Sequence, residues 1–200
     1  MSAFLGPIHN WLFHKILFQD QLTAAIIEGA EEKGYNSELK REVDNRYGSL
    51  PKGELKDIID ESNIHGWLQN QVTLVEYRFA YVVTTLLKED QERLNCIMDI
   101  AYNYGKAHGI DSEATARMAY DLLEDSLLNG MPCDHVNKVT QESNEKICWE
   151  QTLDIHEPYW AEIGGKIKYY YDIREALIKG MIAGSKITFY RINDGKYVLC

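Results

Sequence analysis

The first half of the chain carries a stripe of apolar residues at helical spacing. The stripe consists of Leu68, Val72, Val75, Phe79, Val82 and Leu86. Its spacing alternates between four and three residues, which places all six on one face of a helix. This pattern fits a helix in the core of a bundle, and it also fits a coiled-coil seam through which two copies of the chain form a homodimer. Nearby, His65, Gln69 and Glu76 share another helix face, which is typical of a solvated surface.

Three further segments show helical periodicity: 7–32, 91–107 and 109–130. Pro7 suits the first turn of the first segment, because the missing N–H of proline is not needed there. Asp111 or Ser112 is the expected N-cap of the third segment, and Gly130 is its expected end. Residues 35–62 are polar and less regular, and they indicate a turn followed by one short helix.

Beyond residue 130 the pattern changes from helical to alternating. Residues 135–155 alternate around a turn at 143–144, which predicts a β-hairpin. Residues 185–200 predict a second hairpin around a turn at 194–195. The segment 157–184 between the hairpins returns to helical periodicity.

These elements predict one α+β domain that spans residues 1–200. Its N-terminal two thirds are helical, and a β-β-α-β-β unit follows, with a four-stranded antiparallel sheet around a long helix. A chain of 200 residues is long enough to bury a stable core without disulfides or metal.

Gly164 and Gly165 interrupt the predicted helix at 157–184. Each glycine inside a helix costs roughly 1 kcal/mol relative to alanine. The pair therefore indicates either that the true helix starts after it, or that a ligand or another backbone approaches closely. Gly180 and Gly184 lie four residues apart on one side, which predicts tight packing of the helix on the sheet.

The chain is acidic, with a formal net charge of -10. Such a charge repels phosphate backbones and anionic membranes, so no nucleic acid and no membrane is expected as a partner. No apolar run approaches the roughly 18 residues of a membrane-spanning helix. The apolar stretch 1–21 lacks a basic leader, so a signal peptide is not expected.

The four cysteines are scattered without a C-x-x-C pair, which predicts a reducing, cytoplasmic location.

The densest group of reactive side chains lies in the stretch MPCDHVN, residues 131–137. It contains Cys133, Asp134 and His135 between the end of a predicted helix and the start of a predicted strand. Loops at such junctions often carry functional residues. A helix C-terminus disfavours a thiolate, so an activating partner for Cys133 is expected from elsewhere in the fold.

The second predicted strand supplies such partners. Strict alternation places Cys148, Glu150, Thr152, Asp154 and His156 on one polar face. A turn at 143–144 pairs residues whose numbers sum to 287, which sets His135 opposite Thr152 and one step from Asp154. The two hairpin ends are therefore expected to bring Cys133 or His135 close to Asp154 or His156.

Two kinds of chemistry follow from this arrangement. Cys133, Asp134, His135 and His156 together resemble the ligand set of a divalent transition metal, zinc or iron. Alternatively, Cys133 is a catalytic nucleophile and His156 its general base. If the cluster has no chemical role, its polar residues form a solvated sheet edge, and Cys133 is simply a small buried apolar side chain.

A pocket for a small organic ligand is expected beside this cluster. Its predicted lining consists of Asp154, Tyr159, Trp160, Gly164, Gly165 and Tyr170. Aromatic walls with a few polar groups are typical of such pockets.

The stretch ALIKGMIAGSKITFYRI, residues 176–192, resembles the end of vinyl-reductase-type small-ligand domains and of aminothiazoline-carboxylate hydrolases. In those families a glycine-bearing helix also runs into a paired strand. Their clustered cysteines match Cys133, Cys148 and Cys200 poorly in spacing, so the resemblance implies a small-molecule role and identifies no catalytic residue.

The leading prediction is a cytoplasmic small-ligand- or metal-binding protein with a polar site between the 136–155 hairpin and the helix after Pro158. One alternative is a cysteine-dependent hydrolase of a small molecule that uses Cys133 and His156. Another is a non-catalytic partner protein that dimerises through the stripe at 68–86.

Overall fold

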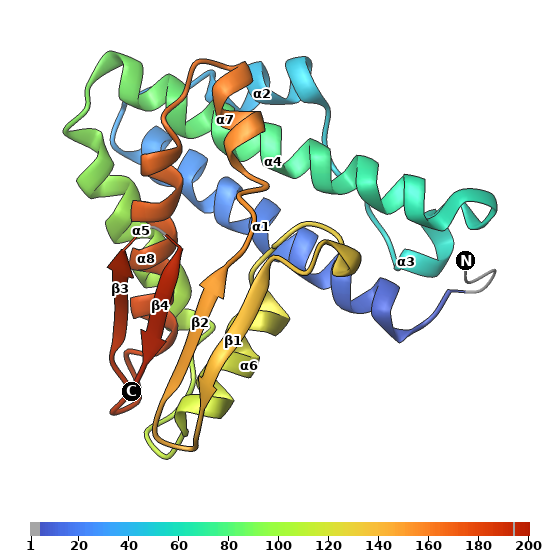
Figure 1. The fold of residues 1–200 in the computed structure, drawn as a ribbon. Coiled ribbons are helices and arrows are strands. Elements are labelled where there is room, and N and C mark those ends of the chain that lie inside the picture. The colour runs from blue at the N-terminus through green and yellow to red at the C-terminus, as the bar shows by residue number, and fades with distance from the viewer. Residues whose placement is uncertain (1–4, 194) are drawn as a thin grey trace.

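The computed structural model describes residues 5–193 and 195–200; residue Asp194 of the second predicted turn lies outside this range. The α-helices are α1 (Pro7–Glu32), α2 (Leu39–Tyr47), α3 (Leu55–Ile58), α4 (Ile64–Glu89), α5 (Arg93–Ala107), α6 (Ala116–Ser126), α7 (Glu157–Glu162) and α8 (Ile167–Met181). The strands are β1 (Asn137–Glu142), β2 (Ile147–Gln151), β3 (Phe189–Asn193) and β4 (Lys196–Leu199). Two short 3-10 turns are η1 (Glu61–Asn63) and η2 (Pro132–Asp134). The predicted α+β class is confirmed (Figure 1).

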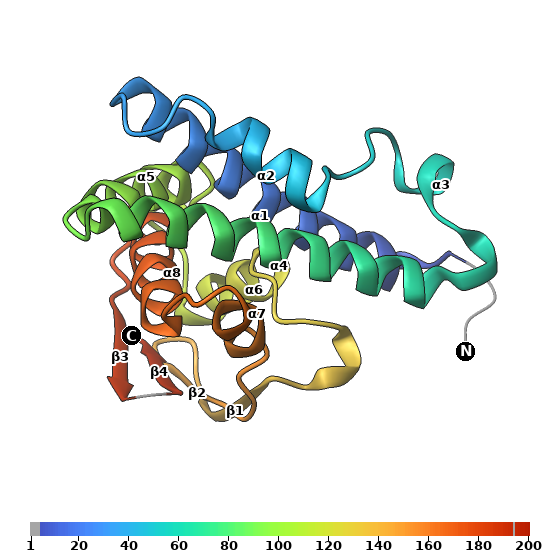
Figure 2. The same ribbon diagram turned by 90° about the horizontal axis from the view of Figure 1, so that it is seen from above.

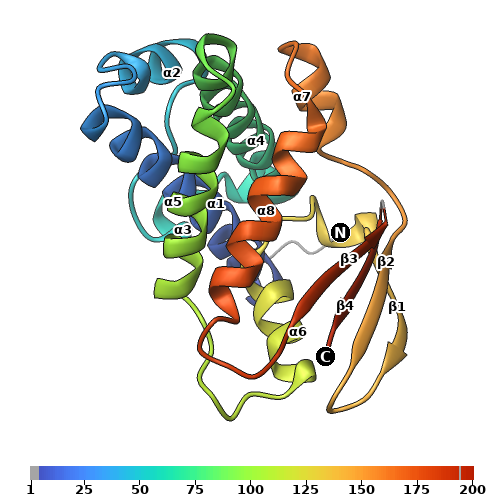
Figure 3. The ribbon, with the colours of Figure 1, turned by 90° about the vertical axis from the view of Figure 1, so that its left-hand side faces the viewer.

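The strands form one antiparallel sheet in the order β1-β2-β4-β3. Figures 1 and 3 show the sheet on one side of the helices, with α6 and α8 next to it. On the covered face, the ring of Trp149 stacks on Tyr197 with centroids 5.3 Å apart and meets Tyr120 of α6 edge-on. These large rings fill the space between the sheet and the helices, as expected for aromatic core residues.

The apolar stripe lies on α4 and is buried within the chain. All six of its side chains are at most 3% exposed. Leu68, Val72 and Val75 pack in one apolar cluster with the first half of α1, and the other three belong to the main core. Figure 2 shows α1 and α4 as two long neighbouring helices, with α7 between α4 and the sheet. The stripe is therefore a bundle-core face, and the side chains that a dimer seam would use are already packed in one copy.

None of the described helices has the length and hydropathy to cross a membrane.

Gly180 of α8 packs against α5, and Gly184, which follows α8, packs against the backbone of Ile110, so the predicted packing of these two glycines on the sheet is wrong. A Cβ added at Gly180 would overlap the carbonyl oxygen of Tyr102 on α5. Reciprocally, a Cβ at Gly105 of α5 would overlap the carbonyl oxygen of Leu177 on α8. The two backbones approach so closely because neither helix carries a side chain at the contact.

The predicted helix at 157–184 is split into α7 and α8. Gly164 adopts a positive φ of 70°, which glycine reaches without steric cost. A Cβ at Gly165 would lie 2.5 Å from Oγ1 of Thr84 on α4, so this turn packs closely against a side chain of the neighbouring helix. The interpretation that the main helix starts after the glycine pair is confirmed.

Other helix details differ from the predictions. Within 35–62 the chain forms α2, a nine-residue helix that is charged except for buried positions such as Leu39 and Val43. The N-cap of α6 is Thr115, whose Oγ1 accepts the N–H of Met118, and not Asp111 or Ser112. These segments carry too few apolar residues for periodicity to place their ends.

The first hairpin forms, but its turn is centred on residues 144–145, one residue later than predicted, with the N–H of Ser143 donating to the carbonyl oxygen of Lys146. Asn137 pairs with Gln151 and Glu142 with Ile147, so the residue numbers sum to 288 and then 289 instead of 287. The later turn causes the difference from 287, and the change between 289 and 288 arises at a bulge between Val139 and Gln141. A bulge inserts one extra residue into a strand, and alternation of side chains along the sequence does not show it.

Candidate functional site

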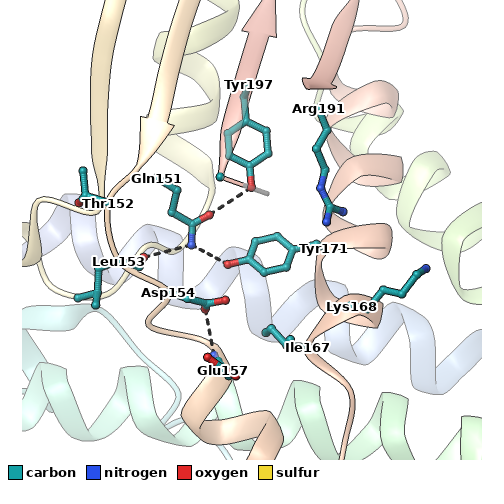
Figure 4. A pocket seen from close by; sticks show the side chains of 11 residues that line it. Gln151, Thr152, Leu153, Asp154, Glu157, Ile167, Lys168, Tyr171, Arg191 and Tyr197 are labelled. Atoms are coloured by element: carbon teal, nitrogen blue, oxygen red, sulfur yellow. Dashed lines mark hydrogen bonds between the residues drawn. The ribbon is translucent and has the colours of Figure 1, made fainter. Parts of the chain in front are cut away.

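A cleft of about 620 Å³ opens where β2 leaves the sheet, beside the start of β4 and of α8 (Figure 4). We name it the strand-end cleft. The polar side chains that line it include Gln151, Asp154, Glu157, Lys168, Tyr171, Arg191 and Tyr197. They come from five segments: the end of β2 with the following loop, α7, α8, β3 and β4. Its volume is typical of sites for small organic molecules.

The floor of the strand-end cleft is held together by one amide. The Nε2 group of Gln151 donates to the hydroxyl oxygen of Tyr171 at 2.6 Å, and its Oε1 accepts from the hydroxyl of Tyr197 at 3.2 Å. Burial raises the pKa of Tyr171 above its ordinary value. The floor therefore presents fixed, neutral hydrogen-bonding groups at neutral pH.

Charged groups of opposite sign stand on different sides of the Tyr171 ring. On one side lie Asp154 and Glu157, and on the other lie Lys168 and Arg191, as Figure 4 shows. The Arg191 guanidinium lies 5.4 Å from the Tyr171 ring centroid. Asp172 of α8 holds the cationic side in place, since it pairs with Lys168 and lies 3.8 Å from Arg191.

Behind the cleft runs a chain of hydrogen-bonded polar groups, which we name the buried polar chain. Its members are Glu76, His156, Tyr170, Arg174 and Asn129. Nδ1 of His156 lies 3.1 Å from both carboxylate oxygens of Glu76, and Nε2 lies 2.8 Å from the Tyr170 hydroxyl. Glu76 is 0% and His156 1% exposed, so these bonds replace all contact with water.

From Arg174 to Glu76 the hydrogen-bond donors run in one direction when neutral His156 carries its proton on Nδ1. Arg174 has only donors, so it donates to the Tyr170 oxygen at 2.8 Å and to Oδ1 of Asn129 at 2.7 Å. The Tyr170 hydroxyl then donates to Nε2 of His156, and Nδ1–H of His156 donates to Glu76. Burial raises the pKa of Tyr170 well above its ordinary value, so its proton stays in place at neutral pH.

The buried polar chain joins the two walls of the strand-end cleft. His156 stands between Asp154 and Glu157 of one wall, and Tyr170 precedes Tyr171 of the floor. The Oδ1 atom of Asp154 accepts the N–H groups of His156 and Glu157 at 2.9 and 3.0 Å, which fixes that loop. The contact between His156 and Tyr170 therefore sets how the loop wall stands relative to α8.

The predicted approach of the two hairpin ends is only partly realised. Oγ1 of Thr152 donates to the carbonyl oxygen of His135 at 3.1 Å. A Cβ at Gly130 would meet both Asp134 and Ile155, so η2 does lie against the loop after β2. Beyond Gln151 the chain leaves the sheet, and the predicted alternation is wrong there: Leu153 is 53% exposed and His156 is buried.

The predicted reactive cluster is dispersed around this junction. Cys133 and His135 are exposed, and Asp134 accepts the N–H of Met131 at 2.8 Å. His156 turns inward, with both ring nitrogens engaged by Glu76 and Tyr170. Within residues 5–193 and 195–200, no three His, Cys, Asp or Glu side chains are grouped to hold a metal ion. The zinc or iron site and the Cys133 nucleophile stay predictions.

The predicted ligand-binding residues divide among four places. Asp154 lines the strand-end cleft, as expected. Trp160 and Tyr170 are 0% and 3% exposed and pack on Phe79, so they belong to the core. The half-buried ring of Tyr159 meets Tyr77 edge-on. Gly164 and Gly165 line a second cleft, of about 340 Å³, between the end of α4 and the start of α8.

Several site residues were not predicted from the sequence. They are Glu76, Gln151, Tyr171, Arg174, Arg191 and Tyr197. Glu76 was assigned to a solvated face, yet it lies four residues after Val72 and three before Phe79, next to the apolar stripe. A carboxylate at that spacing indicates a buried group with a partner, because an unpaired charge is too costly to bury.

Comparisons with models of protein families, with curated proteins and with solved structures give no match to this chain. The resemblance of residues 176–192 to vinyl-reductase-type domains and to aminothiazoline-carboxylate hydrolases therefore stays a prediction. What the protein does has to be argued from the geometry of the strand-end cleft and of the buried polar chain.

Proposed function

We propose that this protein binds a small organic molecule in the strand-end cleft. The observation that carries the proposal is the fixed floor, where the Gln151 amide ties the hydroxyl groups of Tyr171 and Tyr197 to one another. A cleft of about 620 Å³ with a few oriented polar groups has the size and chemistry of a small-molecule site.

The surroundings of the cleft support binding because they are already ordered. Asp154 is held by two backbone N–H groups, and Tyr171 is held by Gln151. The buried polar chain fixes the loop and α8 behind them. A site whose groups are fixed in advance loses less conformational entropy when a ligand binds.

Ligand-observed NMR with a library of small metabolites tests this proposal. A compound that binds here should shift the backbone amide signals of Gln151, Asp154 and Tyr171 in ¹⁵N-labelled protein. Tyr171→Phe, which removes one hydroxyl from the floor, should weaken its binding about fivefold. Compounds that shift only amides remote from the cleft, or a library without any binding compound, would contradict the proposal.

Tyr190→Phe is the matched control, since it makes the same change outside the cleft. Tyr190 lies on β3 and its side chain is 49% exposed. Its replacement should leave the dissociation constant unchanged. An equal loss in both variants would mean that the effect of Tyr171→Phe does not report on the cleft.

A further inference from the structure

We infer that the ligand of the strand-end cleft is a zwitterion of the amino-acid or short-peptide class, with its ammonium group at Asp154 and Glu157 and its carboxylate at Lys168 and Arg191. This inference rests on the proposed function and specifies its ligand. It follows from how the cleft distributes charge, hydrogen-bonding groups and exposed apolar surface.

The acidic side of the cleft is built to receive a cation. Both backbone N–H groups that hold Asp154 bind its Oδ1 atom, which orients the carboxylate at the cleft wall. Glu157 is exposed beside it in the first turn of α7. A ligand ammonium placed here would gain charge-assisted hydrogen bonds, which are stronger than bonds between neutral groups.

The opposite side carries cationic groups that suit a carboxylate. Asp172 keeps Lys168 and Arg191 together at the cleft, and Arg191 also lies over the Tyr171 ring. A guanidinium held in this way has a fixed orientation, and its planar fork of donors matches a carboxylate. Lys168 is mostly exposed and adds a second, more mobile cation.

A ligand with only one charge, or with none, fits this cleft less well. Filling the cleft removes water from both charged sides, and a charge that loses water is costly unless it gains other polar contacts, even where, as at Lys168 and Arg191, Asp172 already lies beside it. An anion would satisfy Lys168 and Arg191 but would face Asp154 and Glu157 across the Tyr171 ring. A molecule with both charges pairs with both sides at once.

Apolar side chains beside the charges suit the body of such a ligand. Leu153 lines the cleft and is 53% exposed, so it presents apolar surface there. Ile167 lines the cleft as well and is partly exposed. An apolar side chain of an amino acid or dipeptide would cover this surface.

Isothermal titration calorimetry with matched ligands tests the inference. The probes are L-phenylalanine and the dipeptide leucyl-phenylalanine, each compared with its N-acetylated and its C-amidated form. At least one free zwitterion should bind about tenfold more tightly than either of its blocked forms, because each block removes one charged hydrogen-bonding group. Blocked forms that bind as tightly as the free ones would overturn the inference.

Variants of two exposed residues assign the two ends. Glu157→Gln should reduce the loss of affinity caused by N-acetylation, because only Asp154 then remains on the acidic side, and should leave the loss caused by amidation unchanged. Lys168→Gln should reduce only the loss of affinity caused by amidation. Glu145→Gln and Lys186→Gln are the matched controls, since both residues are exposed and lie outside the cleft. The inference fails if these controls change the two losses of affinity as much as the cleft variants do.

The same experiments separate failure of the inference from failure of the proposed function. If neither zwitterion binds but another library compound shifts the amides of Gln151 and Tyr171, the inference is wrong and small-molecule binding in the cleft stands. If no compound of any charge shifts these amides, both are wrong.

Discussion

The hydroxyl of Tyr170 lies 2.8 Å from Nε2 of His156, and the two rings stack with centroids 4.0 Å apart. One residue belongs to α8 and the other to the loop after β2. Since the carboxylate of Glu76 on α4 bonds the second nitrogen of the same imidazole, three separate segments meet at one side chain. The position of the cleft wall is thus determined by polar contacts in the interior.

Tyr170→Phe should destabilise the protein by about 1–3 kcal/mol, because it leaves Nε2 of His156 and a donor of Arg174 buried without a partner. The free energy of unfolding from urea titrations measures the effect. Tyr190→Phe removes an exposed hydroxyl and should change stability by less than about 0.5 kcal/mol. Equal stabilities of the two variants would show that the buried polar chain contributes nothing to folding.

The contact between α5 and α8 predicts a strong effect of a single methyl group. Gly180→Ala should cost about 3 kcal/mol or more, because the added Cβ would overlap the Tyr102 carbonyl oxygen and the two backbones would have to separate. Gly164→Ala is the comparison. It has open space around it but a positive φ, so it should cost only about 1 kcal/mol. Thermal unfolding of both variants measures the difference, and a larger loss in Gly164→Ala would contradict this account of the contact.

Periodicity predicted most of the fold because apolar spacing reports directly on which side of an element is buried. The stripe from Leu68 to Leu86 identified α4, and the alternation around 143–144 identified the first hairpin. The bulge after Val139 was not predictable, since an unpaired residue leaves no mark in the pattern of side chains. The register was wrong from the turn onward, because the turn is centred on residues 144–145 and not on 143–144, and the bulge then changes the pairing by one residue.

The site was harder to predict, because its residues are brought together only by the tertiary fold. Asp154 does line the strand-end cleft, but Tyr171, Arg191 and Tyr197 come from segments whose mutual position the sequence does not give. His156 was expected on a polar strand face. The strand ends at Gln151, and the loop turns the ring toward Glu76 instead.

The exposed position of Cys133 predicts that its thiol is dispensable for binding. Cys133→Ser should leave the affinity of the cleft for its ligand unchanged, since Cys133 lies on η2 and does not line the cleft. Iodoacetamide should modify Cys133 and Cys200, both exposed, at similar rates and faster than Cys96 and Cys148. A rate for Cys133 that far exceeds that of Cys200 would instead support the cysteine-dependent hydrolase.

The buried lysine of α1 predicts how stability changes with pH. Lys15 is 2% exposed, with its Nζ atom 3.9 Å from the Trp11 ring centroid. Burial lowers its pKa from 10.5 to about 8, although the carboxylate of Glu124 opposes the shift. Between about pH 8 and 10.5 the unfolded chain therefore holds a proton that the folded protein has released. Stability should rise across this window, by up to about 1.4 kcal/mol per pH unit.

Urea titrations at several pH values between 8 and 9.5 measure this slope. The range ends below pH 10 because burial raises the pKa of Tyr104 to about 12, so tyrosine ionisation in the unfolded chain lowers stability at higher pH. Lys15→Met keeps the apolar stem and removes the charge, so its stability should lack the rise. Lys33→Met, at an exposed position after α1, should keep the slope of the unmodified protein. If Lys15→Met retains the full rise, another group releases its proton in this window, and the charge of Lys15 does not oppose folding.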